Sequence, residues 1–307
     1  MVKTGQDNLV YYIAETAYGT GNTPDDGTWS PFLEVQSVSG RALKQEKKSI
    51  YRHGQRKRSG VVEGKIDPED LVIELFMVDD ATALNFYDVF LEASFEDAYD
   101  EASLTSYTLF IPDNITPASS TDFEYYYGCV LKDVELVISE GDPNIILTAT
   151  FDVQTYTFTT TEAHAPVGAT YTAHPSGLTY LLWSDVALAK ANFAVNGSVT
   201  SIQELNFTVN QNYSKIWTIN GQKYATKNVV EGYEVDGSFT YLYENLTEFH
   251  DEYNDLDGDM TVTITRTTSP IVITIDDMTI DTLSVDSAPN ELQTVDGDFT
   301  ATLLDFA

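Results

Sequence analysis

Cysteine is almost missing from this sequence, and long apolar runs are missing altogether. One cysteine, Cys129, stands among 307 residues, which excludes a disulfide within the chain. No uncharged apolar run approaches the ~20 residues that a membrane helix needs, and residues 1–8 carry no apolar signal-peptide core. We therefore expect a soluble protein without an export signal, stabilised by packing within the chain or against neighbouring chains.

The motifs of common enzyme and metal sites are also missing. The sequence contains no Gly-x-Ser-x-Gly, no His-Glu-x-x-His, no Walker loop, no dinucleotide fingerprint and no paired-cysteine spacing. Residues 254–259 place carboxylates around a glycine as a calcium loop does, but the distal glutamate is absent. We interpret Asp257-Gly258 instead as a turn that leads into a strand at Met260. The sequence predicts no enzyme activity, no cofactor and no metal.

Positive charge is scarce. The chain has 16 Lys and Arg residues against 48 Asp and Glu residues, a formal net charge of −32. Such a chain is not expected to bind DNA through its phosphates, because attraction to phosphates needs basic residues. A negative surface can instead let a polyanion slide past without sticking. Adaptation to salty surroundings, or plain solubility, explains the same acidity, and the two explanations are compatible.

The basic residues that do occur are concentrated in residues 41–65, which we call the basic arm. The arm holds nine of the sixteen basic residues and two acidic ones, a charge of +7 (9−2). A basic arm on an acidic body can dock on the acidic body of another copy, so we interpret it as a self-association element. A nucleic-acid contact and a merely solvated loop remain the alternatives.

Four short segments of the first half return in the second half at nearly one separation. The separation between matching segments is 167 to 169 residues (178−9, 202−35, 221−54 and 229−61). The matching pairs are Leu9–Glu15 with Leu178–Ser184, Val35–Val38 with Ile202–Leu205, Gly54-Gln55 with Gly221-Gln222, and Val61–Gly64 with Val229–Gly232. The repeat predicts two copies of one domain, 1–160 and 178–307, joined by a proline- and glycine-containing linker at 161–177. Two copies can place two equivalent contact surfaces around a ring, which favours assembly over a single catalytic pocket.

The strongest periodicity in both copies is that of a β-strand. Apolar residues alternate at Leu71, Ile73 and Leu75, and again at Phe239, Tyr241 and Tyr243. One short helix is expected in each copy, at 81–93 and at 246–253. We therefore predict a mainly β fold of two tandem homologous β-sandwich or barrel-like domains, each with one short flanking α-helix.

The opening of the chain resembles a known family. Ala14-Glu15-Thr16-Ala17-Tyr18-Gly19-Thr20, a loop at Pro24, a strand at Phe32–Ser39, a basic stretch, and Gly54–Gly64 leading into an amphipathic strand are similar to major tail tube proteins of long-tailed phages and archaeal viruses. The resemblance is clearest over residues 9–92, and the repeat carries it to the second half. It implies a β-sandwich-like tube domain with a flanking helix, joined edge to edge into rings whose inner strands form a continuous barrel, and rings that stack through an extended loop.

In this sequence the stacking loop corresponds to residues 40–60, within the basic arm. The resemblance thus implies inter-ring contacts by Arg41, Lys44, Lys47, Lys48, Arg52, Arg56, Lys57 and Arg58. The corresponding loop of the second copy, 211–227, carries only Lys215, Lys223 and Lys227, so the two copies are expected to make unequal contacts.

The resemblance also implies a structural role in the virion tail, after assembly in the host cytoplasm. The partners would be the chain itself, as a ring of three with pseudo-sixfold symmetry or alternatively of six, then a tape-measure protein and tail terminator and tip proteins. DNA would pass through a negatively lined tube without specific binding. The alternative is a soluble or surface-displayed β-sandwich binding module for a carbohydrate or protein, using Trp29, Trp183, Trp217 or the run Tyr125–Tyr127.

Overall fold

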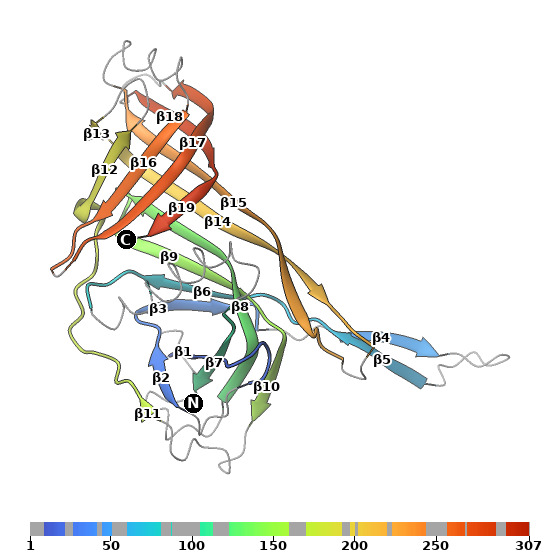
Figure 1. The fold of residues 1–307 in the computed structure, drawn as a ribbon. Helices are drawn as coiled ribbons and strands as arrows, with labels where there is room; N and C mark the ends of the chain where they lie inside the picture. The colour runs from blue at the N-terminus through green and yellow to red at the C-terminus, as the bar shows by residue number, and fades with distance from the viewer. Residues whose placement is uncertain are drawn as a thin grey trace.

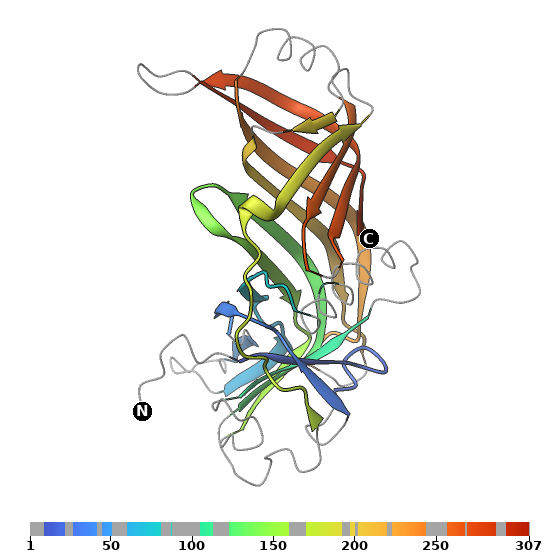
Figure 2. The same cartoon turned by 90° about the vertical axis from the view of Figure 1, so that its left-hand side faces the viewer.

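The computed structural model describes most of the chain and confirms a mainly β fold. It covers residues 9–21, 27–41, 45–50, 60–80, 87, 105–112, 123–159, 170–191, 197–199, 202–219, 223–243, 257–267, 269–286 and 293–306. The first half of the chain lies at the bottom of both views and the second half at the top (Figures 1 and 2). Within the described residues, no helix is long and apolar enough to cross a membrane.

The first half forms two sheets that share one long strand, β8 (Phe123–Ser139), and a separate two-stranded ribbon. One sheet contains β3 (Val35–Ser39), β6 (Leu71–Phe76), β9 (Asp142–Asp152) and the second part of β8. The other contains β2 (Thr28–Pro31), β1 (Tyr11–Ala14), β7 (Tyr107–Pro112), the first part of β8 and β10 (Thr155–Thr159). The ribbon consists of β4 (Gln45–Ile50) and β5 (Gly60–Ile66), and it projects away from both sheets (Figure 1).

The second half is arranged in the same way around its own long strand, β17 (Ile271–Asp286). Its first set of paired strands is β14 (Ile202–Ile216), β15 (Lys227–Leu242), β18 (Thr294–Ala301) and the second part of β17. Its second set is β13 (Gly197–Val199), β12 (Val186–Ala191), β16 (Asp257–Ile264), the first part of β17 and β19 (Leu303–Phe306). A short 3-10 turn, η6 (Trp183–Asp185), precedes β12.

The two halves have the same order of strand pairing. The first half pairs β2-β1-β7-β8-β9-β6-β3, and the second pairs β13-β12-β16-β17-β18-β15-β14. Irregularities also match: β8 has a register shift between Leu131 and Asp133, and β17 has one between Ile280 and Thr282. Gly128 in β8 and Asp277 at the corresponding point of β17 both have positive φ, 60° and 50°. A bulge bends a strand and increases its local twist, so β8 and β17 are bent at corresponding points.

One of the four sequence matches does not correspond in the structure. Leu178–Ser184 was matched to the segment containing β1, yet the position of β1 in the pairing order is taken by β12. Residues 178–182 instead pair with the first half: Leu181 donates its N–H to the Met77 carbonyl (2.9 Å), and Tyr180 bridges to Val78. Short apolar runs look alike in sequence, and only tertiary pairing separates them.

The predicted linker and helices are described only in part. Residues 161–169 of the predicted linker lie outside the described residues, whereas β11 (Thr170–Tyr171) pairs in parallel with β2. The predicted helices at 81–93 and 246–253 lie outside the described residues, apart from Tyr87. Tyr87 is buried, and its hydroxyl accepts the N–H of Val78 at 3.0 Å.

The core follows the alternation read from the sequence. Leu71, Ile73 and Leu75 are buried while Val72 and Glu74 are not. In the pairing order Phe239, the first residue of the second alternating run, corresponds to Ile73 and not to Leu71, because Phe239 faces Leu205 as Ile73 faces Val38. A shift of two keeps the same face, so the predicted core face was unaffected.

The predicted turn at Asp257-Gly258 was wrong: both residues belong to β16, which opens with a bulge against β17.

Candidate self-association surfaces

The structure describes four of the nine basic residues of the arm. Arg41 lies two residues after the end of β3 and pairs with Glu124, with its Nε 2.9 Å from the carboxylate. Lys47 and Lys48 belong to β4, where they lie opposite Glu63 and Val62. Lys65 is exposed at the end of β5, and its Nζ lies 4.2 Å from the Trp217 ring centroid. The remaining five, Lys44, Arg52, Arg56, Lys57 and Arg58, lie outside the described residues.

The arm leaves the body at a point that only glycine can occupy. Gly40 follows β3 with φ of 76°, and a Cβ on it would stand 1.7 Å from the carbonyl oxygen of Asp70. Glycine alone tolerates both the positive φ and this close approach. On the returning strand, the Ile66 N–H donates to the Lys223 carbonyl at 2.7 Å. The base of the arm is therefore held between its own sheet and the second half of the chain.

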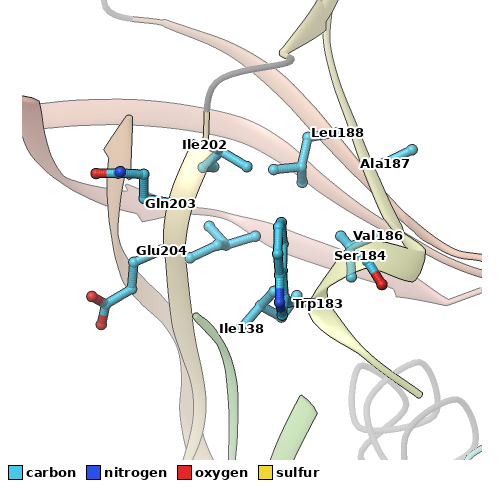
Figure 3. A pocket seen from close by; sticks show the side chains of 10 residues that line it. Ile138, Trp183, Ser184, Val186, Ala187, Leu188, Ile202, Gln203 and Glu204 are labelled. Atoms are coloured by element: carbon cyan, nitrogen blue, oxygen red, sulfur yellow. The ribbon is translucent and has the colours of Figure 1, made fainter. Parts of the chain in front are cut away.

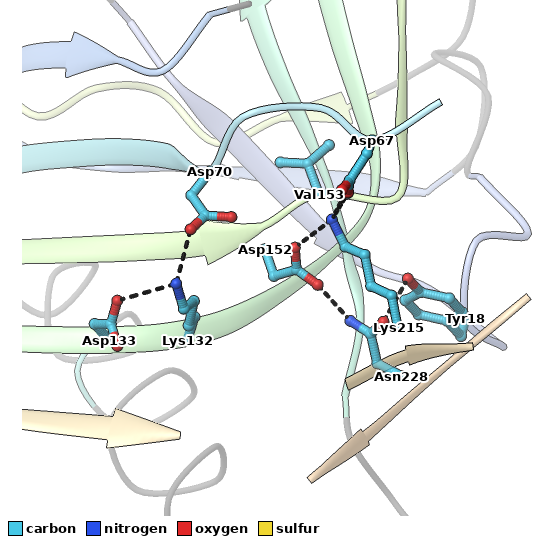
Figure 4. A network of polar contacts seen from close by, with 9 residues as sticks. All are labelled: Tyr18, Asp67, Asp70, Lys132, Asp133, Asp152, Val153, Lys215 and Asn228. Atoms are coloured by element: carbon cyan, nitrogen blue, oxygen red, sulfur yellow. Dashed lines mark hydrogen bonds and ion pairs between the residues drawn. The ribbon is translucent and has the colours of Figure 1, made fainter. Parts of the chain in front are cut away.

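A buried polar network at this base ties the second half to the first (Figure 4). Lys215 of β14 contributes the central ammonium, with Nζ 2.7 Å from Asp152, 2.8 Å from Asp67 and 3.2 Å from the Val153 carbonyl. Asn228 of β15 donates to the other oxygen of Asp152 at 2.7 Å and accepts the Tyr18 hydroxyl at 3.1 Å. The side chains of Lys215 and Asp152 are 12% and 7% exposed, so breaking the pair would leave a buried charge without a partner.

The protonation of the network follows from these contacts. Burial would lower the pKa of Lys215, but its pairing with Asp152 and Asp67 outweighs burial and raises the pKa above that of a free lysine. Beside the network, Lys132 pairs with Asp70 at 2.8 Å, and this contact raises the pKa of Lys132. Both ammonium groups thus stay charged at neutral pH.

The two halves are also joined by a strand pair. β14 of the second half runs antiparallel to the second part of β8, from Glu204 opposite Ser139 to Asn210 opposite Asp133. The pair is supported at both ends, because the Glu140 N–H donates to the Gln203 carbonyl at 2.9 Å and the Tyr213 hydroxyl donates to the Leu131 carbonyl at 2.8 Å. Through this pairing, the sheet of β3, β6, β9 and β8 and the set of β14, β15, β18 and β17 form one run of eight paired strands. We call this run the eight-stranded sheet, β3-β6-β9-β8-β14-β15-β18-β17.

A cavity of about 300 Å³ lies next to this strand pair, beside η6 (Figure 3). Apolar side chains of Ile138, Leu188, Ile202 and Leu205 line it, together with Trp183, which is 42% exposed. The described polar residues on its wall are Ser184, Gln203 and Glu204.

The face of the eight-stranded sheet that points away from the core is acidic and polar. Its acidic members come from five of the strands: Glu74, Asp133, Glu135, Glu204, Glu234, Asp236, Asp296 and Asp298. Serine, threonine and asparagine occupy most of the other outward positions, and Asn206 donates to Glu135 at 3.2 Å. Within the described segments 35–39, 71–76, 133–150, 204–210, 234–242, 282–286 and 294–300, there is no Lys or Arg on this face.

The aromatic residues considered for a ligand site serve mainly as packing. Trp29 and Tyr125 are buried in one cluster with Tyr11, Phe110 and Phe123, and the Phe110 and Tyr125 rings stack at 4.9 Å between centroids. Tyr126 is buried as well, and Trp217 lies under Lys65. Among the described residues, no three His, Cys, Asp or Glu side chains come together as a metal site.

Sequence reasoning missed the network and the strand pair between the halves. Lys215 was singled out only as a basic residue of the second loop, and nothing marked Asp152. The two stand 63 positions apart (215−152), so only the folded chain brings them together. The β14–β8 pair has no local signal either, because any alternating strand can pair with any other.

Comparison with known proteins gives one family and a set of distant folds. A family model described as phage tail tube protein matches residues 5–303. No curated protein matches the chain. A chain in the tail of an empty gene transfer agent particle with C6 symmetry is similar over 40% of this chain and 96% of its own, with 8% identity and a TM-score of 0.32. A chain in the baseplate of an anti-feeding prophage is similar over 53% and 98%, with 14% identity and a TM-score of 0.37.

Proposed function

Because the chain belongs to the phage tail tube protein family, we propose that it assembles into stacked rings that form the tube of a virion tail. The family is one of structural proteins, and the tail is where the chain acts. The observation that carries the proposal furthest is the acidic outer face of the eight-stranded sheet.

That face suits the inner wall of a DNA conduit. Double-stranded DNA carries about one negative charge per 1.7 Å of its axis, so a basic wall would hold it at many points. A wall of carboxylates, hydroxyls and amides offers repulsion and weak hydrogen bonds instead. We place the outward acids of β6, β8, β14, β15 and β18 on the lumen, where DNA passes without specific binding.

The two halves are, in this proposal, copies of one tube domain, close to the expected 1–160 and 178–307. Their common pairing order and matched bulges support it. Three chains would then complete a ring with pseudo-sixfold symmetry, and six chains are the alternative. A closed ring pairs the strand edges that an isolated sheet leaves open to aggregation.

The basic arm is proposed to contact the next ring of the tube. It projects from the body (Figure 1), carries +7 in residues 41–65 (9−2), and would meet an acidic surface on a stacked copy. The contact residues proposed are Arg41, Lys44, Lys47, Lys48, Arg52, Arg56, Lys57 and Arg58. A tape-measure protein inside the tube and terminator and tip proteins at its ends would be the other partners, after assembly in the host cytoplasm.

Electron microscopy of the purified protein over a range of concentrations and salt conditions tests this proposal. We expect rings, and tubes of stacked rings at raised concentration. The ring mass, measured by light scattering, should be three times the chain mass of 34.1 kDa. Persistent monomers under every condition would contradict the proposed function, and a sixfold mass would replace the trimer with the hexamer.

A further inference from the structure

Two strand edges of the eight-stranded sheet have no paired strand in the part of the chain that the structure describes. Among the described residues, β3 pairs only with β6, and residues 280–286 of β17 pair only with β18. The strands that hold the corresponding places, β14 and the second part of β8, pair with each other. The chain thus contains one complete strand pair, β14 with β8. It also contains the two strands of a second, equivalent pair, β3 and β17, which are not paired with each other.

The register of the complete contact can be transferred residue by residue. Ser39 corresponds to Asn206, because each is the third residue after the bulged residue, Gln36 in β3 and Gln203 in β14. Asp286 corresponds to Val137, because β18 and β9 place them opposite Thr294 and Ile146. Within the chain, Asn206 lies directly opposite Val137.

We propose that β3 of one chain pairs antiparallel with β17 of a second copy of this chain, in the register that β14 and β8 use internally. Ser39 then lies opposite Asp286, Gly40 opposite Val285, and Arg41 opposite Ser284. The inference rests on the proposed ring and names the two edges that close it.

Burial on the two edges supports this occupant. Val285 of β17 is 40% exposed, whereas Leu136, its counterpart in β8, is 2% exposed. Leu283 is half-buried where its counterpart Val134 is buried. An exposed apolar edge strand is an aggregation hazard unless another strand covers it. The difference arises because β14 pairs with β8 along this edge, whereas no described segment pairs with the same edge of β17.

Charge on the two edges is complementary. In β8 the bulged residue is Lys132, which pairs with Asp70 of its own half. The bulged residue of β17 is Asp281, which is exposed. In the transferred register the chain continues past Arg41, opposite Ser284, toward Asp281, and Arg41 is the first residue of the basic arm. A second copy would therefore bring the basic arm to the acidic bulge of β17.

Paired cysteines test the register. Oxidised Ser39→Cys/Asp286→Cys should link separate chains into species of two and three chains on a non-reducing gel, because directly opposite residues of an antiparallel pair lie within disulfide reach. The native Cys129 is buried and adds little background. Ser39→Cys/Ser284→Cys, displaced by two residues, is the matched control and should link several-fold less. Asn206→Cys/Val137→Cys places the same pair inside one chain and calibrates the yield.

A second variant tests the edge without cross-linking. Val285→Asp puts a charge on a residue already exposed in the single chain, so folding should survive while assembly stops at the monomer mass. Ile219→Asp makes the same change at a fully exposed residue of the β14–β15 turn and should leave ring mass unchanged. Rings of Val285→Asp, or equal linking in both registers, would overturn this inference and leave the ring itself standing. Absence of any ring in the unaltered protein would instead refute the proposed function.

Discussion

The two hairpins that lead into the eight-stranded sheet differ in continuity and in charge. In the second half, β14 and β15 run unbroken over 15 and 16 residues. In the first half the same path is divided into β3 and β4 outward, and β5 and β6 on the return. The unbroken hairpin is used within the chain, through Lys215 and Asn228, whereas the divided one carries the basic arm away from the body. Two hairpins at corresponding places in the pairing order thus differ in use: one joins the halves of the chain, and the other, in our proposal, contacts a neighbouring chain.

Removal of charge from the divided hairpin should have the largest effect on assembly. Serine in place of Lys47, Lys48, Arg56, Lys57 and Arg58 is expected to abolish stacking of rings while the melting temperature changes little, because the β4–β5 ribbon projects away from both sheets (Figure 1). Negative-stain microscopy gives tube length, and circular dichroism gives the melting temperature.

The matched control lies in the other hairpin. Lys223→Ser/Lys227→Ser removes charge from the unbroken hairpin and should leave tube length near that of the unaltered protein. Equal loss of folding and stacking in the arm variant would show that the arm is part of the core.

Removal of the central ammonium of the unbroken hairpin should have the largest effect on stability. Lys215→Met leaves Asp152 buried without its counter-ion, which typically costs about 3–5 kcal/mol. The free energy of unfolding in urea measures the loss. Lys223→Met, on an exposed side chain of the same hairpin, should change it by less than about 0.5 kcal/mol.

The break between β3 and β4 depends on Gly40. Phe207 holds the corresponding position in β14 and is buried within a continuous strand. Gly40→Ala would bring a methyl group against the Asp70 carbonyl at a positive φ, at a cost of roughly 1–3 kcal/mol. Urea unfolding measures the effect, and a neutral result would mean that the backbone at this break can rearrange freely.

Much of this difference between the halves was predictable, and the part that was not is tertiary. The alternation at Leu71–Phe76 matched β6 residue for residue, because a half-buried strand must alternate. The excess of charge in residues 41–65 also distinguished the two hairpins in the sequence alone. The match of Leu9–Glu15 with Leu178–Ser184 failed, since an apolar run carries no information about its partner. The Lys215–Asp152 pair and the β14–β8 register depend on packing between halves, and no local pattern encodes them.

The two polar ties between the halves should respond to pH in opposite directions. Asp79, just after β6, accepts the Thr267 N–H at 2.8 Å and its hydroxyl, and it pairs with Arg266. The Thr267 hydroxyl, with Arg266, lowers the pKa of Asp79 against the burial that would raise it. A lowered carboxyl pKa stabilises the fold above the unfolded pKa, about 3.9, and this stabilisation is lost as the pH falls through the folded value. The raised pKa of Lys215 gives stabilisation that is present at neutral pH and is lost as the pH rises through the folded-state pKa of the ammonium.

Asp79→Asn tests this difference in pH response and is expected to have the smallest effect on stability of the variants considered. It should flatten the acid side of the stability profile below pH 5 and leave the alkaline side, where Lys215 titrates, unchanged. Urea unfolding between pH 3 and pH 11 measures both sides in one series. Glu234→Gln removes one charge from an exposed position and should leave the slope of the acid side as it is. If Asp79→Asn and Glu234→Gln flattened it equally, general charge repulsion in this chain of net charge −32 would explain acid sensitivity, and the tie at Asp79 would not.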